Sequence, residues 1–197
     1  MRTSLGLTIQ TMVHKIFTRT EPVLLPYYPR LVYLSLLDQG YDDEQLFDGL
    51  GLSAEKLHDE SYRLSIEQHE RFILRILEIT EDPHFAIQLW RLRDHSAANV
   101  ALLTVANCEK ISNALQMITR YNKIFTRVFS VHSLETDDHA IMAVDTHLEH
   151  EAVIYFALSA FSLFLDSYFL DVLKGAHLVK RVELAIPEPV GFSDVRD

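Results

Sequence analysis

The hydrophobic pattern of the chain changes from a helical to an alternating period after Phe125. Before this residue, apolar side chains recur every three or four positions, whereas residues 128–133 place one set of three side chains on each face of a strand and residues 140–146 read as the return strand. Asp137-Asp138 supplies the turn between them. Separate helical and alternating stretches predict an α+β fold, in which a helical layer is followed by a β-β-α-β unit with a small mixed sheet.

Capping signals locate the helices. Ser65 and Gln68 have the spacing of a capping box, and Asp82-Pro83 places an N-cap residue before a proline suited to a first helical turn. The last alternating stretch, at residues 178–186, is closed by two prolines and predicts the final strand. The expected helices span residues 29–37, 42–50, 53–58, 83–92, 109–125 and 149–174, with two more starting at residues 65 and 96.

Residues 152–165 contain no charged side chain, but Asp166 ends the run. A membrane-spanning helix needs about 20 apolar residues, so this segment predicts a buried helix and no membrane partner. The expected domain organisation is an N-terminal arm at residues 1–25, one domain at 26–190 and a short terminal segment at 191–197.

The charge balance argues against direct nucleic-acid binding. The formal net charge is −10, and the region from Asp38 to Glu60 holds eight carboxylates and only one lysine or arginine, Lys56. A phosphate-binding surface needs clustered basic residues. We therefore expect this chain not to bind DNA by itself. The single cysteine, Cys108, allows no intrachain disulfide and fits a cytoplasmic location.

Four histidines, His132, His139, His147 and His150, lie close in sequence and raise the possibility of a metal site. No HExxH element, cysteine pair, nucleophile elbow or dinucleotide fingerprint accompanies them. The sequence therefore predicts no enzyme, no metal and no cofactor. The alternative is a small metal-dependent hydrolase that uses His132, His147 and His150.

The long apolar helix carries one polar stripe on its surface. The residues of this stripe recur at spacings of four, four, three and four, and they are Glu151, Tyr155, Ser159, Ser162 and Asp166. Such a stripe is either the solvent-facing edge of the helix or the lining of a ligand pocket with aromatic walls. An arginine from the preceding helix end would favour an amphipathic ligand that carries a carboxylate. The predicted ligand-binding residues are Arg120, Arg127, Tyr155, Ser159, Ser162 and Asp166.

Five segments of the chain form a recognisable set. They are Asp82-Pro83-His84-Phe85-Ala86-Ile87-Gln88-Leu89, Leu50-Gly51-Leu52-Ser53, residues 96–106, residues 109–121 with Arg120-Tyr121, and residues 182–187. In their order and hydrophobicity these segments resemble the N-terminal, arabinose-binding-type domain of AraC-family transcriptional regulators. The resemblance covers residues 27–189, although alanines stand at positions 97, 98 and 101 where the family pattern leads us to expect glycines.

The resemblance implies that residues 26–190 are the ligand-sensing and dimerisation domain of a bacterial, cytoplasmic transcription factor. Residues 191–197 would then begin a linker to a DNA-binding domain that the chain lacks. Its partners would be a small organic effector, a second copy of the chain, and DNA through a helix-turn-helix domain outside this sequence. For the dimer, the helix at residues 109–125 is an expected surface, because Met117 and Ile124 lie outside its best inner face.

Overall fold

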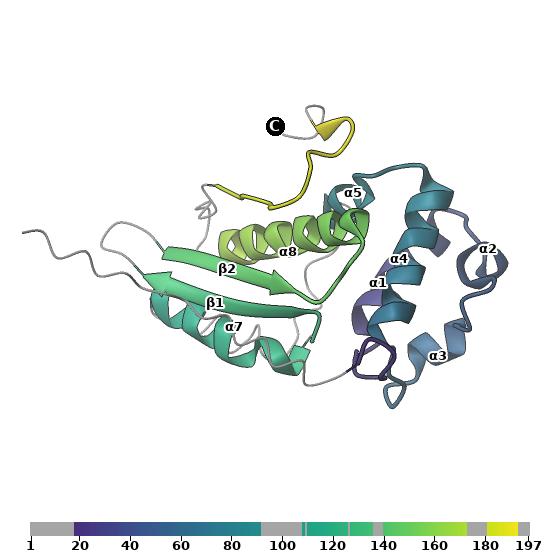
Figure 1. The fold of residues 1–197 in the computed structure, drawn as a ribbon, viewed down its shortest axis with the longest axis horizontal. Coiled ribbons are helices and arrows are strands. Elements are labelled where there is room, and N and C mark those ends of the chain that lie inside the picture. The colour runs from purple at the N-terminus through teal and green to yellow at the C-terminus, as the bar shows by residue number, and fades with distance from the viewer. Residues whose placement is uncertain are drawn as a thin grey trace, which may run out of the picture.

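The computed structural model describes residues 18–91, 108, 110–125, 127–135, 140–172 and 181–192. Within these residues, five helices are followed by a sixth helix, a β-hairpin and a long helix, which confirms the α+β class. Figure 1 shows α1 to α4 gathered at one end of the molecule, with the hairpin, α7 and α8 at the other. The helix expected from Ser96, the turn at Asp137-Asp138 and residues 1–17 of the arm lie outside the described residues.

Two helices of the helical layer begin at polar capping residues, and the predicted start at Ser65 is confirmed, whereas α2 ends at Phe47 and α5 begins at Phe85, a few residues inside the expected bounds. The Asp42 side chain accepts the Gln45 backbone N–H while Gln45 reaches back, and Ser65 and Gln68 form the predicted capping box in the same way. Gly40, at φ 93°, turns the chain away from the end of α1. The helices are α1 (Tyr27–Asp38), α2 (Asp43–Phe47), α3 (Ala54–His58), α4 (Ile66–Thr80) and α5 (Phe85–Arg91).

The second layer contains the point at which the hydrophobic pattern changes from helical to alternating. Helix α7 (Ile111–Phe125) leads into β1 (Phe129–Glu135), which pairs with β2 (Ala140–Thr146) in an antiparallel ladder that sets Val131 opposite Val144. The buried side chain of Asn122 donates to the Phe129 carbonyl at 2.8 Å and so fixes α7 beside the hairpin.

Helix α8 (Glu151–Val172) joins the two layers. Val153 and Phe156 are fully buried in the same apolar cluster as Phe72 of α4, whereas Leu165 packs with Ala114 and Leu115 of α7. The sequence therefore correctly predicts a buried helix here. None of the helices described combines the length and apolar character that crossing a bilayer requires.

The C-terminal segment differs from its prediction. Residues 181–186 form no strand, and residues 178–180 are outside the described part, so the sheet described has two antiparallel strands and is not mixed. Most side chains of residues 181–186 are exposed, which leaves little apolar burial to hold a third strand. The segment instead passes over α5 and α8, where His84 binds it (Figure 1).

Candidate functional site

The polar stripe of α8 begins at a buried tyrosine. Tyr155 is only 3% exposed, so the alternative of a purely solvent-facing edge fails at this residue. Ser159, Ser162 and Asp166 are half-buried further along the same helix. Ser162 hydrogen-bonds back to the Leu158 carbonyl at 2.8 Å, so part of its hydrogen-bonding capacity serves its own helix.

Tyr155 contacts His84, which precedes α5. The Tyr155 hydroxyl lies 2.8 Å from His84 Nδ1, and His84 Nε2 lies 2.9 Å from the Val190 carbonyl oxygen. A carbonyl oxygen can only accept, so Nε2 carries a proton; in the neutral imidazole Nδ1 is then unprotonated and accepts from the Tyr155 hydroxyl. The two hydrogen bonds link α8, the start of α5 and the C-terminal segment. The Phe192 ring also packs edge-on against the Tyr155 ring, with the ring centres 6.3 Å apart.

Local chemistry keeps this link in place. The Asp82 carboxylate accepts the His84 backbone N–H at 2.8 Å, which fixes the turn into α5. Burial raises the pKa of the Tyr155 phenol. A hydrogen bond from Ser159 opposes that rise, and the negative charge of Asp82 adds to it. Tyr155 is therefore a hydrogen-bond donor at neutral pH, and Ser159 belongs to the same cluster.

We expect Tyr155→Phe to lower the free energy of unfolding by about 1–2 kcal/mol, because the buried His84 Nδ1 loses its only described donor. Amide hydrogen exchange at residues 188–192 should become faster as His84 loses its fixed position. Ser162→Ala is the matched control on α8 and should change stability by less than about 0.5 kcal/mol. Equal losses in the two variants would contradict the assigned role of the Tyr155 hydroxyl.

The two predicted arginines lie on a different element from Tyr155. Arg120 is exposed on α7, with its guanidinium carbon 5.7 Å from the centre of the Tyr121 ring, and Arg127 is exposed between α7 and β1. The structure thus groups Tyr155 and Ser159 with His84, which the sequence did not assign to the site. The signal that could have found His84 is its place directly after Asp82-Pro83, at a helix start.

A buried carboxylate at the junction of the two layers was also missed. Glu70 of α4 is 2% exposed and accepts the backbone N–H groups of Glu149, at 2.6 Å, and His150, at 3.2 Å. Arg19 binds the other Glu70 oxygen and also donates to the His147 carbonyl at 3.1 Å. Glu70 therefore caps the N-terminus of α8 from another helix.

The sequence contains a signal for this role, because Glu70 interrupts the apolar face of α4 between Ile66 and Ile73. Burial by itself would raise the pKa of Glu70, but the hydrogen bonds from the Glu149 amide, Arg19 and the His150 amide outweigh it and lower the pKa. Glu70 is thus held as a carboxylate, which suits a structural cap better than an acid catalyst.

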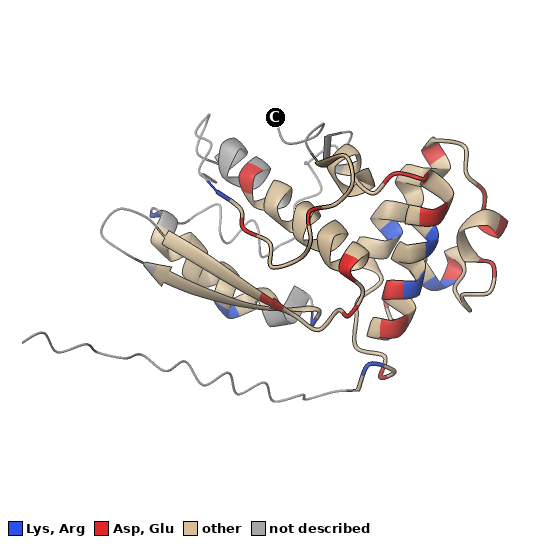
Figure 2. Cartoon of the chain, turned by 45° about the horizontal axis from the view of Figure 1, so that its top comes forward, with Lys and Arg blue, Asp and Glu red and all other residues tan. Residues whose placement is uncertain are grey.

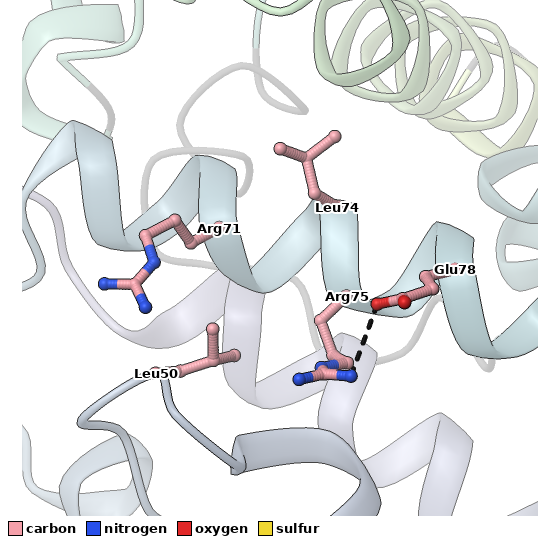
Figure 3. A pocket seen from close by; sticks show the side chains of 5 residues that line it. All are labelled: Leu50, Arg71, Leu74, Arg75 and Glu78. Carbon is pink, nitrogen blue, oxygen red and sulfur yellow. Dashed lines mark hydrogen bonds and ion pairs between the residues drawn. The ribbon is translucent and has the colours of Figure 1, made fainter.

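A separate hollow of about 370 Å³ lies on the other side of α4, lined by Leu50, Arg71, Leu74, Arg75 and Glu78. Figure 3 shows Arg71 and Arg75 extending from α4 toward Leu50. Arg71 donates to the Gly49 carbonyl at 2.6 Å, while Arg75 donates to Asp48 O and to Glu78, both at 3.3 Å. These arginines hold the corner between α2 and α3 on α4, and none of the lining residues belongs to the predicted site.

Of the four histidines, His139 lies outside the described residues, and His132 and His147 do not share a site. His132 is exposed on β1 opposite Ala143 and lies 3.6 Å from the Asp145 carboxylate. His147 is four residues beyond Ala143, which places it about 13 Å further along the ladder. That separation is too long for one metal ion, and in the part of the chain that is described no three His, Cys, Asp or Glu side chains are grouped to hold one.

A family model described as the arabinose-binding domain of AraC transcription regulators, N-terminal, matches residues 40–197. No curated protein and no solved structure matches the chain significantly. The matched stretch takes in α2 to α8 and the C-terminal segment, well over half of the chain. The chain therefore belongs to the family of N-terminal arabinose-binding domains of AraC transcription regulators, and it is a regulatory ligand-binding domain of an AraC-type regulator.

Proposed function

We propose that this domain senses a small amphipathic carboxylate, forms a homodimer, and controls a helix-turn-helix DNA-binding domain in the bacterial cytoplasm. Membership of the family supports the regulatory role. The observation that carries the finer proposal is the hydrogen-bonded link from Tyr155 through His84 to Val190. It connects a polar stripe on α8 with the C-terminal segment at residues 189–192.

We place the effector along the stripe from Tyr155 to Asp166. Ser159 and Ser162 would hydrogen-bond the ligand, and the half-buried Leu158 and Phe161 beside them offer apolar contact. Asp166 would bind a hydroxyl or ammonium group of the ligand and would disfavour a second carboxylate. This mixture of a few polar groups and apolar walls is typical of small-molecule sites.

Arg120 and Arg127 would supply the positive charge for the ligand carboxylate. Within the described residues neither of them forms an ion pair, so both guanidinium groups keep donors for a ligand. Figure 2 shows that most described carboxylates lie on the helical layer, whereas the hairpin is nearly free of charge. An anionic ligand would therefore meet less repulsion beside α7 and the hairpin than beside α2 and α3.

Ligand binding at this stripe would change the hydrogen bond between Tyr155 and His84. A ligand that competes for the Ser159 or Tyr155 hydroxyl alters the donor to His84 Nδ1, and His84 holds the Val190 carbonyl through its other nitrogen. Effector occupancy would thus change how firmly residues 189–192 are held. This gives the domain a short physical path from the ligand to the C-terminal segment.

The test is a thermal-shift screen of straight-chain and aromatic carboxylates, their amides, and arabinose. We expect a carboxylate at about 100 times its Kd to add about 2.7 kcal/mol of stability and to raise the Tm by several degrees, with no rise for the matching amide. Ser159→Ala and Arg127→Gln should each reduce the shift.

Arg75→Gln serves as the control, since it alters the hollow on α4 and leaves the stripe intact. If Arg75→Gln removes the shift while Arg127→Gln does not, the ligand binds the hollow and the proposed site is wrong. A shift with arabinose and none with any carboxylate would contradict the proposed ligand class.

A further inference from the structure

The outer face of α1 is apolar although no described element covers it. Pro29, Val32, Tyr33 and Leu36 are buried on the inner side of the helix. On the opposite side Leu34 is 40% and Leu37 is 36% exposed. Leu31 lies on the same outer stripe and is half-buried, since it is three residues before Leu34. Leu25, just before the helix, is 37% exposed, so exposed large apolar residues concentrate at this helix.

The charges on this face oppose the helix dipole. Arg30 lies at the first turn of α1 and Asp38 is its last residue, whereas a helix favours acids at its start and bases at its end. Arg30 stacks over the Tyr27 ring at 5.9 Å, and Asp38 forms no ion pair with any described residue. The stability of α1 itself therefore does not explain why these two charges stand where they do.

We propose that this face binds the same face of a second copy of the chain, with the two α1 helices antiparallel and Leu34 at the two-fold axis. In this arrangement, the residue four positions before Leu34 in one copy lies beside the residue four positions after Leu34 in the other copy. Arg30 of each copy then meets Asp38 of the other, while Leu31 comes level with Leu37. The apolar centre with an ion pair at each end makes the face self-complementary.

Self-association is part of the proposed function, and this inference rests on that part alone.

The other apolar surfaces described fit a second copy of the chain less well than the outer face of α1 does. Met117 of α7 is half-buried against Ala114 and Leu115, and Leu134 and Ile141 form a single exposed cross-strand pair near the end of the hairpin. Neither surface carries opposite charges at matching distances from a centre. Helix α1 lies before residue 40, where the family match begins, so the proposed face is outside the matched residues.

The experiment is sedimentation velocity of the full chain over concentrations from about 5 to about 300 micromolar. A helix face of this size is smaller than the roughly 800 Å² per partner of a standard interface, so we expect a weak dimer with a Kd on the order of tens of micromolar. Leu34→Asp places two carboxylates at the two-fold axis and should raise this Kd at least about tenfold. Arg30→Asp and Asp38→Arg, made singly, set like charges opposite each other and should each raise it about three- to tenfold.

The double variant Arg30→Asp with Asp38→Arg should restore the wild-type Kd to within about threefold, because each new pair is again complementary. The two residues are about 12 Å apart along their own helix, so pairing within one chain cannot produce this rescue. Helix-dipole effects predict that the double variant is no less stable than the wild type, which circular dichroism on heating checks.

A wild-type chain that stays monomeric throughout the range would overturn the inference. So would a dimer unaffected by Leu34→Asp, which would move the interface elsewhere and leave homodimerisation intact. A double variant as weak as the singles would contradict the antiparallel pairing. None of these outcomes bears on effector binding, which the thermal-shift screen measures separately.

Discussion

Replacing Glu70 by alanine is expected to lower the free energy of unfolding by about 3–5 kcal/mol, the loss typical of removing one partner of a buried ionic network. The Glu70 carboxylate accepts two backbone N–H groups at the start of α8 and also binds Arg19. Without it, the α8 amides lose their cap and the Arg19 guanidinium is left partly buried without its main partner. Chemical denaturation followed by circular dichroism measures the effect.

Glu78→Ala is the matched control on the same helix, because Glu78 is 70% exposed and, among the residues that the structure describes, its ion pair is with Arg75. It should cost less than about 1 kcal/mol. Glu70→Gln keeps an oxygen acceptor for α8 but removes the charge, so an intermediate loss is expected if the alanine variant does not fold. Similar losses for Glu70→Ala and Glu78→Ala would contradict the capping role.

The second large effect is a loss of stability in mildly acidic solution. His69 lies buried on α4, and its burial lowers the pKa of its imidazole from 6.5 to about 4, with the Glu70 charge opposing this shift only in part. Because the unfolded chain takes up the His69 proton first, the stability is fully present above pH 6.5 and is lost as the pH falls toward 4. A shift of this size corresponds to about 3 kcal/mol.

Glu70 contributes in a lower range. Its folded pKa is lowered from 4.5, so its contribution is present above pH 4.5 and is lost as the pH falls further. Denaturant unfolding at a series of pH values should therefore show a first decline between about pH 6.5 and 4 and a second one below it. His69→Leu should flatten the first decline and leave the second unchanged. Titration of His69 by NMR provides a check that needs no variant, since an ordinary His69 pKa would contradict the prediction.

The sequence by itself determined the elements that local chemistry controls. Ser65 and Gln68 specified the start of α4 through a capping box, because the backbone donors and side-chain acceptors involved lie within one helical turn. The period change after Phe125 specified the hairpin and the fold class. The charge-free run at residues 152–165 specified a buried helix. In each case the deciding interaction is local or depends only on which face is apolar.

The predicted last strand shows where this reasoning stops. Residues 181–186 alternate in the sequence, but a strand needs a neighbouring edge to pair with, and pairing is decided by the whole fold. In the structure His84 holds the following residues at the Val190 carbonyl instead. The same limit applies to the polar stripe of α8, whose spacing left open whether Tyr155 faces solvent or protein.

Tertiary structure alone decided the long-range pairings. Glu70 is 79 residues from Glu149 along the chain, and His84 is 71 from Tyr155 and 106 from Val190. No periodicity relates positions so far apart, because their contact depends on how whole layers pack. The sequence specified which residues are polar on apolar faces. Only the fold determined which partners satisfy them, since a buried polar group must be paired wherever the packing brings a partner within reach.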